Sequence, residues 1–252
     1  MNKNFKEAFE KTRIAGSIAA GALDEVSKIV KPGISTNEID KTCYEYINDH
    51  KAYSAPLYYR GFPKSCCTSV NHVVCHGIPS EKILRDGDIM NVDVTALKEG
   101  WHGDTSRMFK VGEVSVKAEK LIQTTYEAMM KAIKVVKDGV LLGDIGSAIQ
   151  SHVESNGFSV VQDFCGHGIG QSFHQEPNVL HYGKKGTGEK IKSGMIFTIE
   201  PMINLGRFET KTLKDGWTAV TKDKTLSAQF EHTIGVTNEG YEIFTLSSDK
   251  IN

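Results

Sequence analysis

The chain of 252 residues lacks the features that direct a protein to a membrane or to a polyanion. No apolar run approaches the ~18 residues that a membrane-spanning helix needs, and the N-terminus has no apolar signal-peptide core. Lys and Arg number 30 against 31 Asp and Glu, which gives a formal net charge of −1. The protein therefore has no global field that would draw it onto nucleic acid or an anionic membrane. We predict a cytoplasmic protein without DNA or membrane partners.

Cysteine is also scarce, and its pattern argues against two kinds of cross-link. Disulfide frameworks use an even number of cysteines, and structural zinc sites use C-x-x-C pairs. Neither feature is present among the five cysteines, which are Cys43, Cys66, Cys67, Cys75 and Cys165. We predict reduced thiols. Linkers and low-complexity tracts are absent as well, so residues 1–252 are predicted to form a single domain.

What the sequence does contain is an internal similarity. Residues 5–31 and 117–136 both have apolar residues three and four positions apart, the pattern of amphipathic helices, and Ser35 and Glu38 form a capping box before a further helix. Four segments of the first half resemble four of the second half in the same order: 29–34 with 135–140, 38–39 with 144–145, 76–78 with 167–169, and 87–93 with 194–200. Chance is the alternative for any single match. The set favours two related halves, 5–112 and 113–252, in an α/β (α+β) fold with helices packed on a curved, mainly antiparallel sheet.

Two acidic residues are expected to meet across a hairpin. In a strand from Asp88 to Thr95, alternate apolar residues face the helices and Asp93 lies on the opposite face. A turn at 98–100 leads into a second strand, 101–111, which carries Asp104. The count from the turn places the two carboxylates nearly opposite each other. A solvent-facing Asp93 is the alternative, but like charges that face each other destabilise a sheet unless a cation lies between them.

Two glutamates are predicted to lie in strands that should be buried. Residues 194–203 are almost wholly apolar, as in a strand buried on both faces, yet Glu200 lies among them. A second strand, 229–234, places Gln229 and Glu231 on one face. Burial of an unpaired carboxylate costs several kcal/mol. Because neither segment offers a well-placed Arg or Lys for an ion pair, metal ions are the predicted neutralisers.

His167 is the fifth candidate ligand, and the charges predict the number of ions. Three glycines at alternate positions, 166, 168 and 170, permit close backbone approach and unusual φ angles around it. A phosphate-binding loop is the alternative, but no Lys-Ser/Thr pair follows. The four carboxylates sum to −4, which two divalent ions balance. Carboxylate and imidazole ligands suit Mn(II), Fe(II), Co(II) or Zn(II), and such a metal pair supplies a nucleophilic water for hydrolysis.

Six short segments together resemble the type I methionine aminopeptidases in their bacterial form: 74–79, 91–95, 102–106, 165–170, 197–202 and 229–233. The resemblance covers nearly the whole chain. It implies the pita-bread fold with pseudo-twofold halves, and a metalloaminopeptidase that removes the N-terminal methionine of nascent polypeptides when the second residue is small. It also implies a dinuclear site in which Asp93 and Glu231 bridge both ions, and the full ligand set is Asp93, Asp104, His167, Glu200 and Glu231.

The resemblance also implies the residues that act on the substrate. Glu200 would accept a proton, His174 would stabilise the oxyanion and His76 would contact the scissile amide nitrogen; the residues alone leave both histidines open. The methionine pocket would be lined by Tyr59, Phe62, Cys67, His76, Phe173 and Trp217. The sequence departs from the usual family pattern at Pro56, Arg60 and Phe62, which changes the polarity of the pocket and no metal ligand.

Two other functions compete with this prediction. One is an Xaa-Pro aminopeptidase or prolidase of the same fold, although such enzymes usually carry an additional N-terminal domain. The other is a binding protein that keeps the fold and has lost catalysis, although such relatives normally lose metal ligands. The family resemblance also implies a monomer, and the ribosome is a candidate partner because the substrates are nascent chains.

Overall fold

Helices form where the sequence places apolar residues three and four apart. The computed structural model describes residues 3–247, with side chains from residue 5 onward. The predicted capping box is confirmed, because the Ser35 side chain accepts from the Glu38 amide and the Glu38 carboxylate accepts from the Ser35 amide. None of the helices in this range is both long and apolar enough to cross a membrane. The helices are α1 (Lys3–Ile29), α2 (Thr36–Asp49), α3 (Val116–Val135), α4 (Leu142–Ser155) and the 3-10 turn η1 (Tyr59–Gly61).

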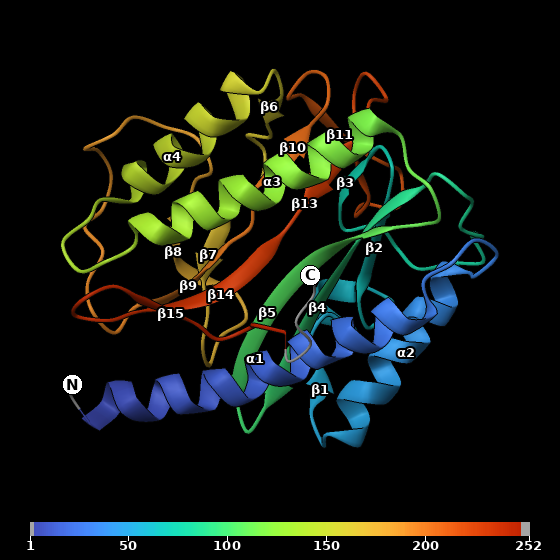
Figure 1. Cartoon of the computed structure of the whole chain (residues 1–252). Helices are drawn as coiled ribbons and strands as arrows, with labels where there is room; N and C mark the ends of the chain where they lie inside the picture. The colour runs from blue at the N-terminus through green and yellow to red at the C-terminus, as the bar shows by residue number, and fades with distance from the viewer. Residues whose placement is uncertain (1–2, 248–252) are drawn as a thin grey trace.

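Antiparallel pairing dominates the strands of the described region (Figure 1). The large sheet has the order β1-β4-β5-β14-β9-β7-β8, with β2 on β4 and β15 on β14. Its strands are β1 (Tyr53–Ser54), β2 (Cys67–Val70), β4 (Ile89–Lys98), β5 (Trp101–Lys110), β7 (Gly166–Gly168), β8 (Gln175–Val179), β9 (Ile196–Ile199), β14 (Glu231–Val236) and β15 (Tyr241–Ile243). Two small sheets contain β13 (Ser227–Gln229), β10 (Met202–Asn204) and β6 (Ser159–Val160), and β11 (Thr210–Thr212), β12 (Ala219–Thr221) and β3 (Val73–Cys75).

Each helix pair covers a different part of the sheet. In Figure 1, α1 and α2 lie together beside β4 and β5, and α3 and α4 lie beside the strands of the second half. Met90, Val92 and Val94 are fully buried in one core with the apolar faces of α1 and α2, as the alternation predicts. A second core joins α3 and α4 to Phe197, Ile199 and Ile234. The apolar face of the sheet is buried in these two cores, and its polar side chains lie on the opposite face.

Helix α1 packs very closely on β5. A Cβ added at Gly103 would collide with the backbone of Gly16, so the strand has no room for a side chain at this crossing. Further along the same contact, Arg107 of β5 forms a buried ion pair with Asp24 of α1, with 3.0 Å between Nη2 and Oδ1. Close contact of α1 with β5 therefore depends on small residues at one point and on a charge pair at another.

We expect Gly103→Ala to destabilise the protein. The added methyl group would push α1 away from β5, and overpacking of this kind costs ~1–3 kcal/mol. The free energy of unfolding from urea titration measures the effect. Gly240→Ala is the matched control, because a Cβ at Gly240 would meet no atom within 4 Å. Equal stability of the two variants would contradict the close packing described above.

Two strands predicted to be continuous are each broken. The expected strand 194–203 divides into β9 of the large sheet and β10 of a small sheet, with Glu200 and Pro201 between them. The expected strand 229–234 divides at Phe230 into β13 and β14 in the same way. Proline has no amide hydrogen for a ladder, which accounts for the first break. At both breaks the chain changes sheets, and an acidic residue lies at each of them.

Candidate metal centre

All of the predicted site residues line one cavity of about 380 Å³. The predicted metal ligands come from five separate segments: β4, β5, β7, the end of β9 and the start of β14. The cavity is lined by all five of them, Asp93, Asp104, His167, Glu200 and Glu231, and by all of the predicted substrate-binding residues, Tyr59, Phe62, Cys67, His76, Phe173, His174 and Trp217.

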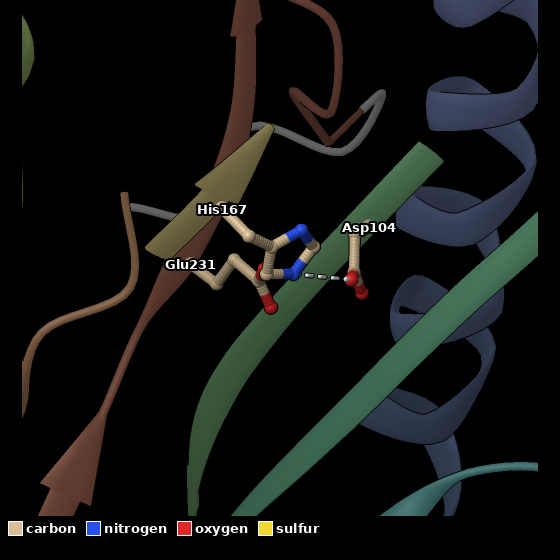
Figure 2. Close-up of side chains that lie close together, drawn as sticks. All are labelled: Asp104, His167 and Glu231. Atoms are coloured by element: carbon tan, nitrogen blue, oxygen red, sulfur yellow. Dashed lines mark ion pairs between the residues drawn. The ribbon is translucent and has the colours of Figure 1, made fainter. Parts of the chain in front are cut away.

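Three buried side chains form the centre of this group. Asp104, His167 and Glu231 each place one potential ligand atom within 4.8 Å of the others (Figure 2). The Nε2 atom of His167 lies 3.7 Å from Oδ2 of Asp104 and 3.6 Å from Oε1 of Glu200. Distances of this size suit atoms that surround a common centre, since carboxylate and imidazole ligands each lie ~2 Å from a bound transition metal.

The hairpin register places Asp93 on the same face of the sheet as Asp104. Thr95 pairs with Asp104, and Asp93 pairs with Ser106, so the two carboxylates are offset by two residues instead of directly opposite. The reason is a tight turn at Glu99 and Gly100, whose φ angles of 48° and 81° are both positive, as in a type I′ turn. Diagonal neighbours at this offset are still within side-chain reach.

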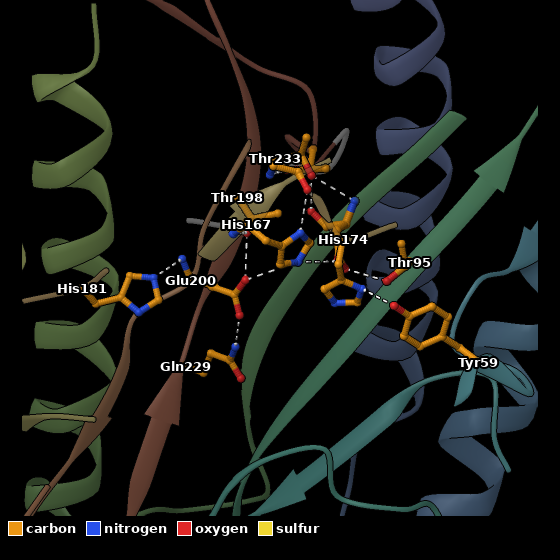
Figure 3. Close-up of polar contacts among 12 residues, drawn as sticks. Tyr59, Thr95, His167, His174, His181, Thr198, Glu200, Gln229 and Thr233 are labelled. Atoms are coloured by element: carbon orange, nitrogen blue, oxygen red, sulfur yellow. Dashed lines mark hydrogen bonds and ion pairs between the residues drawn. The ribbon is translucent and has the colours of Figure 1, made fainter. Parts of the chain in front are cut away.

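Neighbouring polar groups orient the acidic side chains (Figure 3). Thr95 donates to Oδ1 of Asp104 at 2.7 Å, and Thr198 donates to Oε1 of Glu200 at 2.8 Å. Gln229 donates to the other oxygen of Glu200 at 3.4 Å. The backbone amide of Glu200 donates to Nε2 of the fully buried His181. Each of these contacts holds a carboxylate or its backbone without supplying a positive charge.

The glycines around His167 act through close approach alone. A Cβ at Gly166 would collide with the carbonyl of Thr198, and one at Gly168 would collide with the carbonyl of Glu176. The unusual φ angles predicted for them are wrong, because the φ angles of Gly166, Gly168 and Gly170 lie outside the left-handed region. The ring of His167 is oriented by its Nδ1 atom, 3.1 Å from the carbonyl of Gly168, which leaves Nε2 toward the acids.

Burial raises the pKa of every carboxyl group in the centre. Desolvation is the largest cause, and it raises the pKa of Asp93 to about 7 and that of Glu200 to about 8. The pKa values of Asp104 and Glu231 are raised well above their usual range, by burial and by repulsion from the neighbouring acids. Among residues 3–247, Lys and Arg form no ion pair with any of the four. Such a cluster is stable in its ionised form only with bound cations.

Comparisons with known proteins agree with this geometry. The profile of metallopeptidase family M24 matches residues 10–238. The methionine aminopeptidase of Rickettsia prowazekii is 58% identical over 245 residues, which cover 97% of this chain and 95% of that protein. The methionine aminopeptidase of Escherichia coli K12 is 55% identical, covering 96% and 93%. The crystal structure of the Rickettsia prowazekii methionine aminopeptidase superposes with a TM-score of 0.95 at 57% identity, covering 96% of this chain and 98% of that one.

The chain belongs to metallopeptidase family M24, and within it to the methionine aminopeptidases. The predicted pita-bread fold is thereby confirmed as a curved antiparallel sheet with helices packed on it. A prolidase from Pyrococcus furiosus shares this fold with a TM-score of 0.77 at 21% identity, and the match covers 97% of this chain and 65% of that one. At that identity the likeness concerns the fold alone.

Family M24 implies divalent metal ions, and the residues of this methionine aminopeptidase fit them. The donor set of carboxylate oxygens and one imidazole nitrogen suits divalent first-row transition metals. The orientation of His167 fits as well, because metal-binding imidazoles use the second ring nitrogen to bond a carbonyl or carboxylate. The buried Oε1 atom of Gln229 has no hydrogen-bond partner in the described region, so the centre is also short of donors.

The aromatic side of the cavity contains the remaining predicted residues. The ring of Trp217 packs edge-on against Phe62 at 5.2 Å and against His76 at 6.3 Å between ring centres. His76 has a φ of 56°, in the left-handed region that few non-glycine residues adopt and that recurs at functional sites. The cavity has further lining residues that were not predicted as site residues, namely Cys75, Thr95, Asp163, Phe164, Cys165, Met202 and Gln229. All but Asp163 lie within the six motif segments or directly beside them, and that proximity is the signal that could have found them.

Proposed function

We propose that the chain is a methionyl aminopeptidase that removes the N-terminal methionine of nascent polypeptides whose second residue is small. One observation supports this most directly: four carboxylates, two of them buried, and one buried imidazole share a cavity with an aromatic wall, in a chain of the methionine aminopeptidase family. Aromatic and thiol groups provide polarizable surroundings for a thioether. The cavity thus combines a hydrolytic centre with a surface suited to the methionine side chain.

Two divalent ions held by Asp93, Asp104, His167, Glu200 and Glu231 would neutralise the acids, polarise the scissile carbonyl and lower the pKa of a water to near neutrality. Glu200 is the proposed proton acceptor, since its carboxylate lines the same cavity as the other acids and would be ionised once the cations are bound. Hydrogen bonds from Thr198 and Gln229 hold its two oxygens in place for that transfer.

The two cavity histidines act on the substrate in this proposal. Burial, then the neighbouring His167 and Arg60, lowers the pKa of His174 to about 3, so the ring is neutral at neutral pH. A neutral imidazole can donate one hydrogen bond to the oxyanion. Burial lowers the pKa of His76 too, and this ring would contact the scissile amide nitrogen. Both rings line the same cavity as the acids, as these roles require.

The chain is further proposed to act as a monomer with cobalt, manganese, iron or zinc, and in contact with the ribosome. The internal duplication into halves 5–112 and 113–252 remains a prediction within one domain. In support, each half contributes one helix pair packed on the large sheet, α1 with α2 and α3 with α4. Each half also contributes one histidine to the cavity from a His-Gly-Ile segment, His76 and His167.

Peptide hydrolysis tests the proposed function. We expect the enzyme loaded with Mn(II) or Co(II) to release methionine from Met-Ala-Ser. Ala-Pro and Xaa-Pro peptides should not be cleaved, because the aromatic pocket favours a thioether. Mass spectrometry of the products measures the cleavage, and addition of a chelator should abolish it. Preferential cleavage before proline would favour the prolidase-like function. No chelator-sensitive cleavage of any of the peptides would favour a non-catalytic binding protein.

A further inference from the structure

The loop that carries Tyr59 has an unusual backbone. Tyr58 and Arg60 have φ angles of 64° and 48°, both in the left-handed region, on either side of Tyr59 in the 3-10 turn. Side chains other than glycine rarely adopt such angles, at a cost of ~1–3 kcal/mol each, and they cluster at functional sites. The side chain of Tyr58 is 75% exposed, whereas that of Tyr59 lines the cavity. The strained backbone positions therefore lie on both sides of the residue whose ring lines the cavity.

That ring is one of several that surround the imidazole of His174. The Tyr59 ring is stacked on His174, with 5.2 Å between ring centres and 28° between planes. Phe173 and His167 pack on the same imidazole at 4.1 and 4.2 Å. In Figure 3 the ring of His174 lies between those of His167 and Tyr59. These three ring contacts restrict the position of the imidazole, although His174 is an exposed residue. The ring can still differ in which nitrogen carries the proton.

One hydrogen bond influences which ring nitrogen of His174 carries the proton. The Nδ1 atom of His174 lies 3.1 Å from the hydroxyl of Tyr59, and this bond can form in either direction. A neutral imidazole carries a proton on only one nitrogen, and histidine is ordinarily neutral above pH ~7. A phenol is a good donor, and its oxygen is a weak acceptor because one lone pair is delocalised into the ring. The favoured arrangement has the Tyr59 hydroxyl as donor and Nδ1 as acceptor, with the proton on Nε2.

We propose that Tyr59 is a positioning residue that holds His174 in the tautomer protonated on Nε2. The inference rests on the proposed function, in which His174 donates a hydrogen bond to the oxyanion. In the opposite tautomer Nε2 carries a lone pair, which repels an oxyanion. The resemblance assigns Tyr59 to the methionine pocket alone. The hydroxyl thus has a role in the chemical step that is separate from the role of the ring in the pocket.

Steady-state kinetics of Tyr59→Phe separate these two roles. Phenylalanine keeps the ring and removes only the hydroxyl, so we expect the KM for Met-Ala-Ser to stay within about twofold. The kcat should fall by about 10- to 100-fold, by analogy with the loss of a partner that orients a metal-binding imidazole. Tyr58→Phe is the matched control, since it removes an exposed hydroxyl from the same turn, and it should leave both constants unchanged. An unchanged kcat in Tyr59→Phe, with or without a higher KM, would overturn the proposal.

The tautomer itself can be observed without turnover. In the zinc-loaded protein, nitrogen-15 NMR distinguishes the protonated ring nitrogen of each histidine, and His174→Gln identifies the signals of His174. We expect Nε2 to carry the proton in the native protein and both nitrogens to share it in Tyr59→Phe. A proton on Nδ1 in the native protein would refute the inference. If the native enzyme releases no methionine, the proposed function fails, while the NMR result still decides the tautomer.

Discussion

Replacement of Glu231 by Gln is expected to lower kcat/KM for Met-Ala-Ser by more than about 100-fold and to reduce the bound metal. The side chain is 2% exposed and belongs to the group of three whose ligand atoms lie within 4.8 Å of one another. Changes to residues that merely orient a metal ligand cost about 10- to 100-fold, so loss of a proposed bridging ligand should cost more. Elemental analysis after dialysis measures the metal, and the peptide assay measures the activity.

The same variant should keep its fold. Glutamine has nearly the shape of glutamate, and removal of one buried negative charge relieves repulsion from Asp104, Glu200 and Asp93 in the metal-free protein. Circular dichroism and thermal melting serve as the check. Glu239→Gln is the matched control, since it removes the same charge from an exposed position on the segment after β14. Native metal content in Glu231→Gln would contradict the proposed role of Glu231.

Metal-free protein is expected to lose stability as the pH rises from about 6.5 to about 8.5. A carboxyl group with a raised pKa keeps its proton in the folded state after the unfolded chain has lost it, so stability falls until the pH passes the folded value. The relevant values are about 7 for Asp93 and about 8 for Glu200, against ordinary values of 3.8 and 4.5. Thermal melting in a pH series measures this decline.

Two buried histidines also make stability depend on pH, so the decline is tested only between about pH 6.5 and 8.5. The pKa values of His181 and His232 are lowered by burial to about 3 and about 4, from an ordinary value of 6.5. Their folded forms resist protonation, so their contribution to stability rises as the pH rises toward 6.5 and then levels off. Below this pH the two effects oppose each other. Above it the carboxyl groups of the centre dominate, and a rise in melting temperature there would contradict the charge argument.

Addition of a divalent ion near pH 8 should reverse the loss. A ligand at 100 times its dissociation constant stabilises the folded state by about 2.7 kcal/mol, which corresponds to a rise in melting temperature of about 5 to 10 °C. Mn(II) is compared with potassium chloride at the same ionic strength, which should have little effect. Glu231→Gln should show a smaller rise than the native protein. An equal rise in melting temperature in the native protein and in Glu231→Gln would indicate that the stabilising ions bind elsewhere on the chain.

Local patterns in the sequence predicted the helices and the β4–β5 hairpin correctly. The buried residues of α2 include Ile39, Cys43 and Ile47, as expected from their spacing, and the capping box forms as predicted. The offset between Asp93 and Asp104 was less accurate because it depends on the turn. A count centred on Glu99 places Thr105 opposite Asp93, whereas the two-residue turn at Glu99 and Gly100 places Ser106 there, so the pairing moves by one position.

The breaks in the strands could not be predicted from alternation alone. Residues 196–199 and 202–204 are both buried and mostly apolar, and nothing in the side chains shows that they pair in different sheets. The choice of sheet depends on distant partners: β9 pairs with β14 and β7, whereas β10 pairs with β13 and β6. Pro201 was the one local sign of the first break. Phe230 gives no such sign for the second.

The order of strands in the large sheet determines when the protein can first become active. Strand β14 follows every other strand of the large sheet except β15, yet it lies between β5 and β9 and supplies Glu231. A growing chain emerges from its N-terminus, so the middle of the sheet stays open until β14 has been synthesised. Incomplete chains therefore lack the assembled acidic group. The acidic group cannot assemble before translation has passed Val236, and truncations that remove β14 should abolish it.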